Sequence, residues 1–276
     1  MKRFLFFMLL IATAAACGGA GGSNTQTLDI AYPNADVVTV NLSTTSGQIG
    51  VSAGDSAGVH GTVTTNVGAW QAATSSDASS ISVTQGTASA DVIPNAQNTW
   101  DVQLGKAKAL ILNHSNTAAN TTLNLGGLSL TQLNVTATTG NYTVRFATAN
   151  PSSGMATFQS GNGDFDLAGL SNSNLSNLGI TTTGGSIQLG FDGAALTQNM
   201  NVRIDTQAGD VLIKIPTGVP TQITYNSPSG AVLEADPQYT KTNGITYTVG
   251  NYATSDGSRL TIEIRSVVGD LRLAGA

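Results

Sequence analysis

A glycine recurs along this chain at nearly constant intervals, and no other feature limits the possible folds as strongly. Five successive members of the series are separated by 23, 22, 24 and 21 residues, and two more distant glycines have the same kind of sequence on both sides. Self-similarity at a period of roughly 20 to 50 residues is typical of repeat architectures. We call the series the corner glycines: Gly47, Gly140, Gly163, Gly185, Gly209, Gly230 and Gly269.

Apolar residues stand at fixed distances from every corner glycine. The positions seven and five residues before it, and two and four after it, are apolar in 27 of 28 cases, whereas a hydrophobic content of 40% applied to 28 positions gives about 11. The exception is Glu234. The residues between these positions are mostly polar, so the period is two on both sides of the glycine. This pattern predicts a strand, a corner and a second strand in each repeat.

Such a unit cannot bury its apolar side chains alone, but it can when it stacks on its neighbours. We therefore predict an all-β fold, a single-stranded right-handed β-helix or β-solenoid with coils of about 22–24 residues. Parallel pairing between coils at about 4.8 Å would give on the order of ten coils in a rod near 50 Å long. A β-sandwich is the rival fold, and the constant phase of the glycines favours the solenoid.

The solenoid domain is expected over residues 28–276, with two interruptions of the period. Residues 52–105 contain both tryptophans, Trp70 and Trp100, and we expect an irregular, capping segment there. We interpret residues 235–258 as an insertion or a cap, with ITYTV as a strand and SDG as its turn, because the ends of a solenoid need covers. A second series of corners would stack Leu128, Leu170 and Leu196.

The N-terminus has the pattern of a processing signal. A basic start, MKR, precedes the apolar run FLFFMLLIAT and the sequence AAAC. We predict a lipoprotein signal peptide at residues 1–16, lipidation of Cys17 and a flexible Gly- and Ser-rich tether at 17–27. The alternative is an ordinary signal-peptidase site at the three alanines. Cys17 is the one cysteine of the chain.

Charge limits the partners of the processed chain. Removal of Lys2 and Arg3 leaves 9 of 11 basic residues against 16 acidic ones. An anionic protein is poorly suited to nucleic acid. We therefore expect no nucleic-acid partner, and a membrane contact made through the lipid at Cys17.

The stretch GNGDFDL at residues 161–167 is similar to the calcium-binding nonapeptide, in which tandem turns supply carbonyls and aspartates. The equivalent stretches one coil away, TTGNYTVRF and TGGSIQLGF, have no carboxylate at the matching places. Asp164 and Asp166 alternate with Phe165 and Leu167, which is the pattern of a solvated strand face. We therefore assign no metal residue.

The remaining polar residues do not form a recognisable catalytic motif. Asp210 and Asp270 follow corner glycines, where aspartate is a common turn residue. His60 and His114 are the only histidines, and neither stands in a motif with a serine or aspartate partner. We predict no catalytic residue and no cofactor. Carbohydrate binding stays open, because outward rows of Asn, Thr, Ser and Gln can hydrogen-bond sugars.

The order of several motifs is similar to a known family. WDVQLGKAKALILNHSN, TTLNLGGLSLTQLNVTATTGNYTVRF, TGGSIQLGF, QAGDVLIKIPTGVPTQITYNSPSGAVLEAD and LTIEIRSVVGDLRL follow one another along residues 28–276. Together they resemble the bacterial family of proposed adhesins of unknown function, and its relative, the toast-rack domain of cell-envelope stress proteins. The resemblance implies a β-helix-like fold outside the cytoplasm, and it supplies no catalytic residues.

These observations predict a non-catalytic lipoprotein of the cell envelope or cell surface, acting as an adhesin or an interaction scaffold with a glycan or protein partner. A carbohydrate- or peptidoglycan-binding module is the alternative. An enzyme acting on polysaccharides is the least favoured interpretation, since each carboxylate is explained by its position in a turn or on a solvated strand face.

Overall fold

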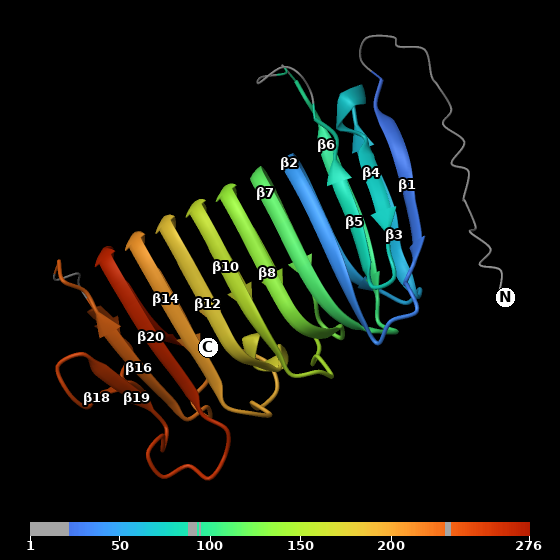
Figure 1. The fold of residues 1–276 in the computed structure, drawn as a ribbon. Helices are drawn as coiled ribbons and strands as arrows, with labels where there is room; N and C mark the ends of the chain where they lie inside the picture. The colour runs from blue at the N-terminus through green and yellow to red at the C-terminus, as the bar shows by residue number, and fades with distance from the viewer. Residues whose placement is uncertain (1–21, 88–92, 94, 230–232) are drawn as a thin grey trace.

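The chain winds into one long stack of strands, shown in Figure 1. The structure, a computed structural model, describes residues 22–87, 93, 95–229 and 233–276. Its described part is all-β apart from two short 3₁₀ turns, η1 (Gly68–Trp70) and η2 (Leu170–Asn172). Most strands pair in parallel, which agrees with the predicted β-solenoid and excludes a sandwich of two antiparallel sheets.

Two rows of parallel strands form opposite sides of the stack. The first row, which we call the long-strand face, runs in spatial order through β5, β2, β7, β8, β10, β12, β14, β20 and β16. The second row, the short-strand face, runs through β6, the later parts of β2 and β7, and then β9, β11, β13, β15, β21 and β17. The bounds are β2 (Val37–Gly54), β5 (Ser80–Gln85), β6 (Asn98–Gly105), β7 (Ala109–Asn124), β8 (Ser129–Thr139), β9 (Tyr142–Arg145), β10 (Gly154–Asn162), β11 (Phe165–Ala168), β12 (Leu175–Gly184), β13 (Ile187–Gly190), β14 (Met200–Ala208), β15 (Val211–Ile215), β16 (Thr221–Asn226), β17 (Leu233–Ala235), β20 (Leu260–Val268) and β21 (Leu271–Gly275).

The corner glycines stand where the chain passes from one face to the other. From Gly140 to Gly269 the described members have φ between 105° and 147°, a conformation that other residues rarely adopt. They also touch the coil below: a Cβ on Gly163 would lie 2.0 Å from the carbonyl oxygen of Gly140, and one on Gly185 would lie 2.2 Å from that of Gly163. Both the backbone and the neighbouring coil therefore require glycine here. Gly230 lies outside the described residues.

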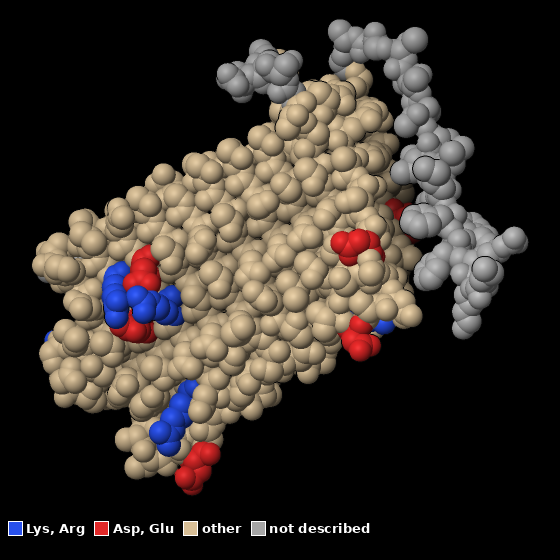
Figure 2. Space-filling model, in the orientation of Figure 1, with Lys and Arg blue, Asp and Glu red and all other residues tan. Residues whose placement is uncertain are grey.

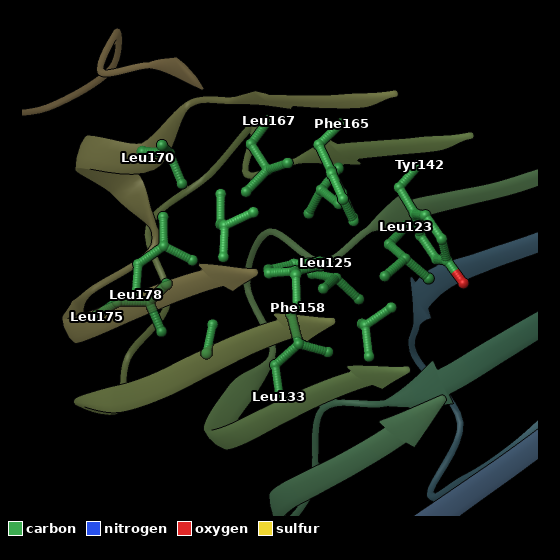
Figure 3. Close-up of a cluster of buried hydrophobic side chains, with 14 of the residues drawn as sticks. Leu123, Leu125, Leu133, Tyr142, Phe158, Phe165, Leu167, Leu170, Leu175 and Leu178 are labelled. Carbon is green, nitrogen blue, oxygen red and sulfur yellow. The ribbon is translucent and has the colours of Figure 1, made fainter. Parts of the chain in front are cut away.

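The core is a tube of stacked apolar side chains between the two faces. Apart from Glu234, the apolar positions predicted from the corner glycines are buried wherever the structure describes them. Each large aliphatic or aromatic side chain buried in this way contributes about 1.5–3 kcal/mol. Figure 3 shows the middle of the tube, where the rings of Tyr142 and Phe165 stack at 5.5 Å and Phe158 meets Phe165 edge-on at 5.8 Å. Of the second corner series, Leu128 and Leu170 are buried and Leu196 is partly buried.

The N-terminal end is built from ordered strands, so the expectation of an irregular segment at 52–105 is wrong. After η1, a hairpin of β4 and β5 extends the long-strand face. On the other face β3 pairs antiparallel with β6, and β1 pairs antiparallel with β3. The predicted tether is also too long, because residues 24–27 already belong to β1 and pair with β3. The new strands are β1 (Asn24–Ala31), β3 (Gly58–Thr65) and β4 (Ala72–Ser76).

The C-terminal end departs from the order of the sequence. The last pair of strands, β20 and β21, lies between β14–β15 and β16–β17, and Gly269 therefore stacks on Gly209. Leu233 and Ala235 are in register with Leu271 and Leu273, so Glu234 points outward beside Arg272. The inward positions of this repeat are therefore displaced by one residue relative to the other repeats, which explains why a polar residue stands at the predicted apolar position.

Residues 235–258 lie beside this end of the stack. They contain β18 (Thr240–Lys241) and β19 (Thr246–Val249), and β19 pairs antiparallel with both β18 and β16. The ITYTV stretch therefore does contain a strand. SDG at 255–257 is not its turn, because the β18–β19 hairpin turns before β19 and SDG lies in the following loop.

Candidate functional site

The long-strand face carries columns of outward polar side chains, because its parallel strands are in register. One of these, which we call the central column, crosses the face near the middle of the strands. After Ser82, its members change along the stack from amides to small residues and then to charged residues, and a threonine follows at the end. In spatial order they are Ser82, Asn41, Asn113, Asn134, Thr157, Gly179, Arg203, Glu263 and Thr224.

The first part of the central column is an asparagine ladder. Asn113 Nδ2 donates to Asn41 Oδ1 at 2.8 Å, and Asn134 Nδ2 donates to Asn113 Oδ1 at 2.7 Å. A side-chain amide is both a donor and an acceptor, so each asparagine can orient the next one along the stack. The ladder fixes the positions of polar groups on an exposed surface.

The charged part of the central column belongs to a cluster of four charges on β14 and β20. Arg203 Nε donates to Asp205 Oδ2 at 2.7 Å, and Arg265 Nη2 donates to Glu263 Oε1 at 2.6 Å. The two pairs lie side by side with opposite polarity, because Arg203 is in register with Glu263 and Asp205 with Arg265. Figure 2 shows this cluster as one group of alternating red and blue on an otherwise tan part of the sheet.

Between the ladder and the charges the face is hollowed. A groove of about 390 Å³ crosses β8, β10, β12, β14 and β20, and we call it the face groove. It is lined by side-chain amides, threonines, Met155 and the backbone at Gly179, with Arg203 and Glu263 at one end.

A second groove, of about 450 Å³, lies on the short-strand face and is acidic. It contains Asp164, Asp166, Asp210 and Asp270, together with Arg272. Asp164 is exposed beside buried Phe165, and Asp166 forms an ion pair with Arg145. These positions match the solvated strand face expected from the sequence. In the described part of the chain, no three His, Cys, Asp or Glu side chains are placed to share a metal ion.

The side chains directly after the corner glycines hydrogen-bond the backbone of the neighbouring coil, a role that the sequence pattern did not indicate. The Oδ1 of Asp164 accepts the backbone N–H of Ser186 at 2.8 Å, and the Oδ1 of Asp210 accepts that of Asp270 at 2.9 Å. Asn141 accepts the N–H of Asp164 in the same way, at 3.0 Å. Each side chain thereby holds the backbone of the next coil.

The two histidines lie in different environments. His60 on β3 is half-buried, and its Nδ1 lies 3.0 Å from Asp29 Oδ1 on β1. His114 is only 2% exposed and belongs to a buried polar cluster, in which its Nε2 lies 3.1 Å from Thr121 Oγ1 and Asn116 hydrogen-bonds Tyr142. Burial lowers the pKa of His114 to about 4. The imidazole is therefore neutral at pH 7.

This buried cluster lies at a corner that has no glycine. Ala119 takes the corner position, in register with Gly47, and Asn116 donates to the carbonyl of Ala119 at 3.3 Å. In other coils a hydroxyl three residues before the corner glycine also donates to a carbonyl at the corner. Thr182 Oγ1 donates to the carbonyl of Gly184 at 2.8 Å, and Thr206 Oγ1 donates to that of Ala208 at 3.2 Å. This supporting hydroxyl could have been found in the sequence, because Ser or Thr recurs three residues before the corner glycines.

The two tryptophans differ in burial. Trp100 on β6 is 1% exposed, and its Nε1 donates to Asn98 Oδ1 at 3.0 Å. Trp70 is half-buried in η1. Trp100 therefore packs inside the N-terminal end of the stack. The predicted lipidation site Cys17 and the signal peptide 1–16 lie outside the described residues.

The fold and its outward columns place the molecule in the class of β-solenoids with extended polar faces. Residues 19–168, more than half of the chain, match the family described as the N-terminal domain of toast_rack, DUF2154, and the chain belongs to that family. No curated protein matches the sequence. Over the described residues, no helix is long and apolar enough to span a membrane.

Solved structures of low sequence identity resemble this fold. A proposed cell adhesion protein from Clostridium sporogenes is 15% identical with a TM-score of 0.50, over 92% of this chain and 100% of its own. A proposed adhesin from Parabacteroides distasonis is 10% identical with a TM-score of 0.46, over 94% and 98%. One from Bacteroides fragilis is 11% identical with a TM-score of 0.41, over 92% and 97%. At 15% identity, the similarity to the Clostridium protein shows that the two chains share a fold.

Proposed function

We propose that the chain is a non-catalytic surface lipoprotein of the cell envelope that acts as an adhesin or interaction scaffold. The long-strand face carries this proposal: a continuous apolar core holds an extended row of in-register polar side chains open to solvent. The description of the Clostridium protein as a proposed cell adhesion protein supports the same role. We take the coils to be right-handed, with 22–24 residues each over β8 to β14.

Several charged side chains of both faces have structural partners, which supports a non-catalytic role. Asp164 and Asp210 hold the backbone of the next coil, Arg145 pairs with Asp166, and the four charges on β14 and β20 neutralise one another. A catalytic acid or base would need to be free to exchange a proton with a substrate.

The anchor would sit at one end of the stack. Strand β1 begins at Asn24, so six residues separate it from Cys17. An acyl chain buried in a membrane contributes about 0.8 kcal/mol per CH₂ group. A diacylglycerol at Cys17 would therefore hold the β1 end near the membrane and project the other coils away from it.

Acylation is tested by expressing the full chain in a bacterial host and supplying an alkyne-tagged fatty acid. The wild-type chain should carry the label and sediment with membranes, whereas Cys17→Ser should lose the label and leave the membrane fraction. A wild-type chain that is secreted without label would overturn the anchor and favour the ordinary signal peptide.

Adhesion is tested with the same cells on layers of envelope polysaccharide, of matrix protein and of other cells. Retention above that of cells without the chain, lost with Cys17→Ser, is the expected result. Equal retention on every layer would refute the proposed role.

A carbohydrate-binding module is the second candidate function, and the amides that line the face groove favour it.

A further inference from the structure

The face groove contains a glycine that the fold does not require. Gly179 lies inside β12, in register with Thr157 on one side and Arg203 on the other. Its φ is not positive, and no atom lies within 4 Å of the place where a Cβ would stand. The corner glycine Gly185, six residues later, is constrained in both respects.

A glycine inside a strand weakens it, since it has no side chain to pack and a large backbone entropy to lose. Such a residue often marks a place where a ligand approaches the backbone closely. At Gly179 the missing side chain leaves the floor of the groove open between Asn177 and Arg203. The surface is therefore hollow where a threonine, as at position 157, would fill it.

The lining of the groove is suited to hydroxyl groups. Gln132, Asn177 and Asn201 lie at the same level on β8, β12 and β14, and Met155 occupies that level on β10. An amide offers both a donor and an acceptor, as a sugar hydroxyl does. Met155 is 50% exposed, and its thioether chain offers an adaptable apolar surface to the C–H side of a ring.

Charge favours an uncharged ligand. Among the described residues of the lining, the charged ones are Arg203 and Glu263, and each is paired with an opposite charge, Asp205 and Arg265. The rest of the lining is neutral, so the groove has no net charge to attract an ion. Four spacings of about 4.8 Å across its five strands give a length of roughly 19 Å, enough for about four sugar units.

We propose that the face groove binds an uncharged, extended glycan, laid across β8 to β20 with one ring over Gly179. This inference rests on the proposed adhesin role and names its ligand class. The asparagine ladder holds one side of the groove, because Gln132 Nε2 donates to Asn134 Oδ1 at 3.1 Å and Asn134 in turn donates to Asn113.

The test is calorimetric titration of the detergent-solubilised full chain with tetrasaccharides of β-1,4-linked glucose, β-1,4-linked N-acetylglucosamine and galacturonate. We expect one of the two neutral tetrasaccharides to bind, with a Kd little changed by added salt. Gly179→Thr should weaken binding about tenfold or more by filling the floor, an effect of about 1.4 kcal/mol. Thr136→Asn, on the same face outside the groove, should change the Kd less than about twofold.

In the titration, three results would overturn the inference: no binding of either neutral tetrasaccharide, preference for galacturonate, or equal binding by Gly179→Thr. Thermal unfolding of both variants checks that they are folded. The proposed function is judged separately by retention of cells. Cells that adhere equally with Gly179→Thr would leave the adhesin role standing and remove the glycan site.

Discussion

The corner of the solenoid and its long-strand face use glycine for different reasons. Gly185 turns the chain between β12 and β13, has φ of 105° and leaves no room for a Cβ beside the carbonyl of Gly163. Gly179, on the same coil, has ordinary strand geometry and open space above it. One glycine is demanded by the fold, and the other lowers the stability of a strand without helping the fold. Substitutions at the two regions should therefore have opposite effects.

The largest effect is expected from Gly185→Val. A Cβ at this position would lie 2.2 Å from the oxygen of Gly163, and a β-branched residue is strained at positive φ. We expect the free energy of unfolding to fall by about 3 kcal/mol or more. Urea unfolding followed by circular dichroism measures it. An unchanged midpoint would mean that the corners tolerate side chains, and the comparison would then fail.

The corner without a glycine gives the next largest effect, and it depends on pH. In the unfolded chain His114 takes a proton near pH 6.5, whereas in the fold burial lowers its pKa to about 4. The unfolded state therefore binds more protons between these values, and stability falls as the pH drops from 6.5 to 4. A shift of this size corresponds to about 3 kcal/mol.

The measurement is the free energy of unfolding as a function of pH for wild type and His114→Gln. The groups that touch His114, namely Asn116, Thr121 and Tyr142, remain uncharged, since burial raises the pKa of the tyrosine. The His114→Gln curve should be flatter than the wild-type curve in this window, whatever its absolute level. His60→Gln is the matched control, and an identical slope in all three proteins would contradict the assignment to His114.

Local periodicity was enough to predict the repeat but not the order of its coils. Phe158 and Ile180 could be assigned to the core because alternation about a corner glycine fixes which side chains point inward. The insertion of β20 between β14 and β16 could not be predicted, because Gly269 has the same neighbours as any other corner glycine and lies 60 residues after Gly209. Pairing partners so distant are set by the packing of the ends.

The candidate site was also only partly visible in the sequence. The outward polar rows followed from the period, but Gly179 was not recognised among 32 glycines. It becomes distinctive only when its φ and the space around it are known. The buried polar cluster was missed for a related reason: Ala119 occupies a corner without the glycine that marks the others.

A smaller effect is expected at the hydroxyl that supports the Gly185 corner. Thr182 is 3% exposed and donates to the carbonyl of Gly184, so Thr182→Val would leave that carbonyl without this donor. We expect a loss of about 1 kcal/mol. Thr181→Val, one residue away on the exposed side, should change stability by less than about 0.5 kcal/mol. Equal losses for the two variants would show that the hydroxyl does not support the corner.

The smallest effect has the opposite sign. Gly179→Thr should stabilise the protein by about 0.5–1 kcal/mol, because threonine is a good strand former and the space above residue 179 is open. Gly161→Thr, also on the long-strand face, is the matched control, and there the Cβ would lie 2.6 Å from the carbonyl oxygen of Thr138 and should destabilise. If thermal unfolding instead shows that both substitutions destabilise, the fold requires glycine at position 179 as it does at the corners. A gain at 179 with a loss at 161 would mean that the chain keeps a glycine in β12 at a cost in stability, which a bound ligand would explain.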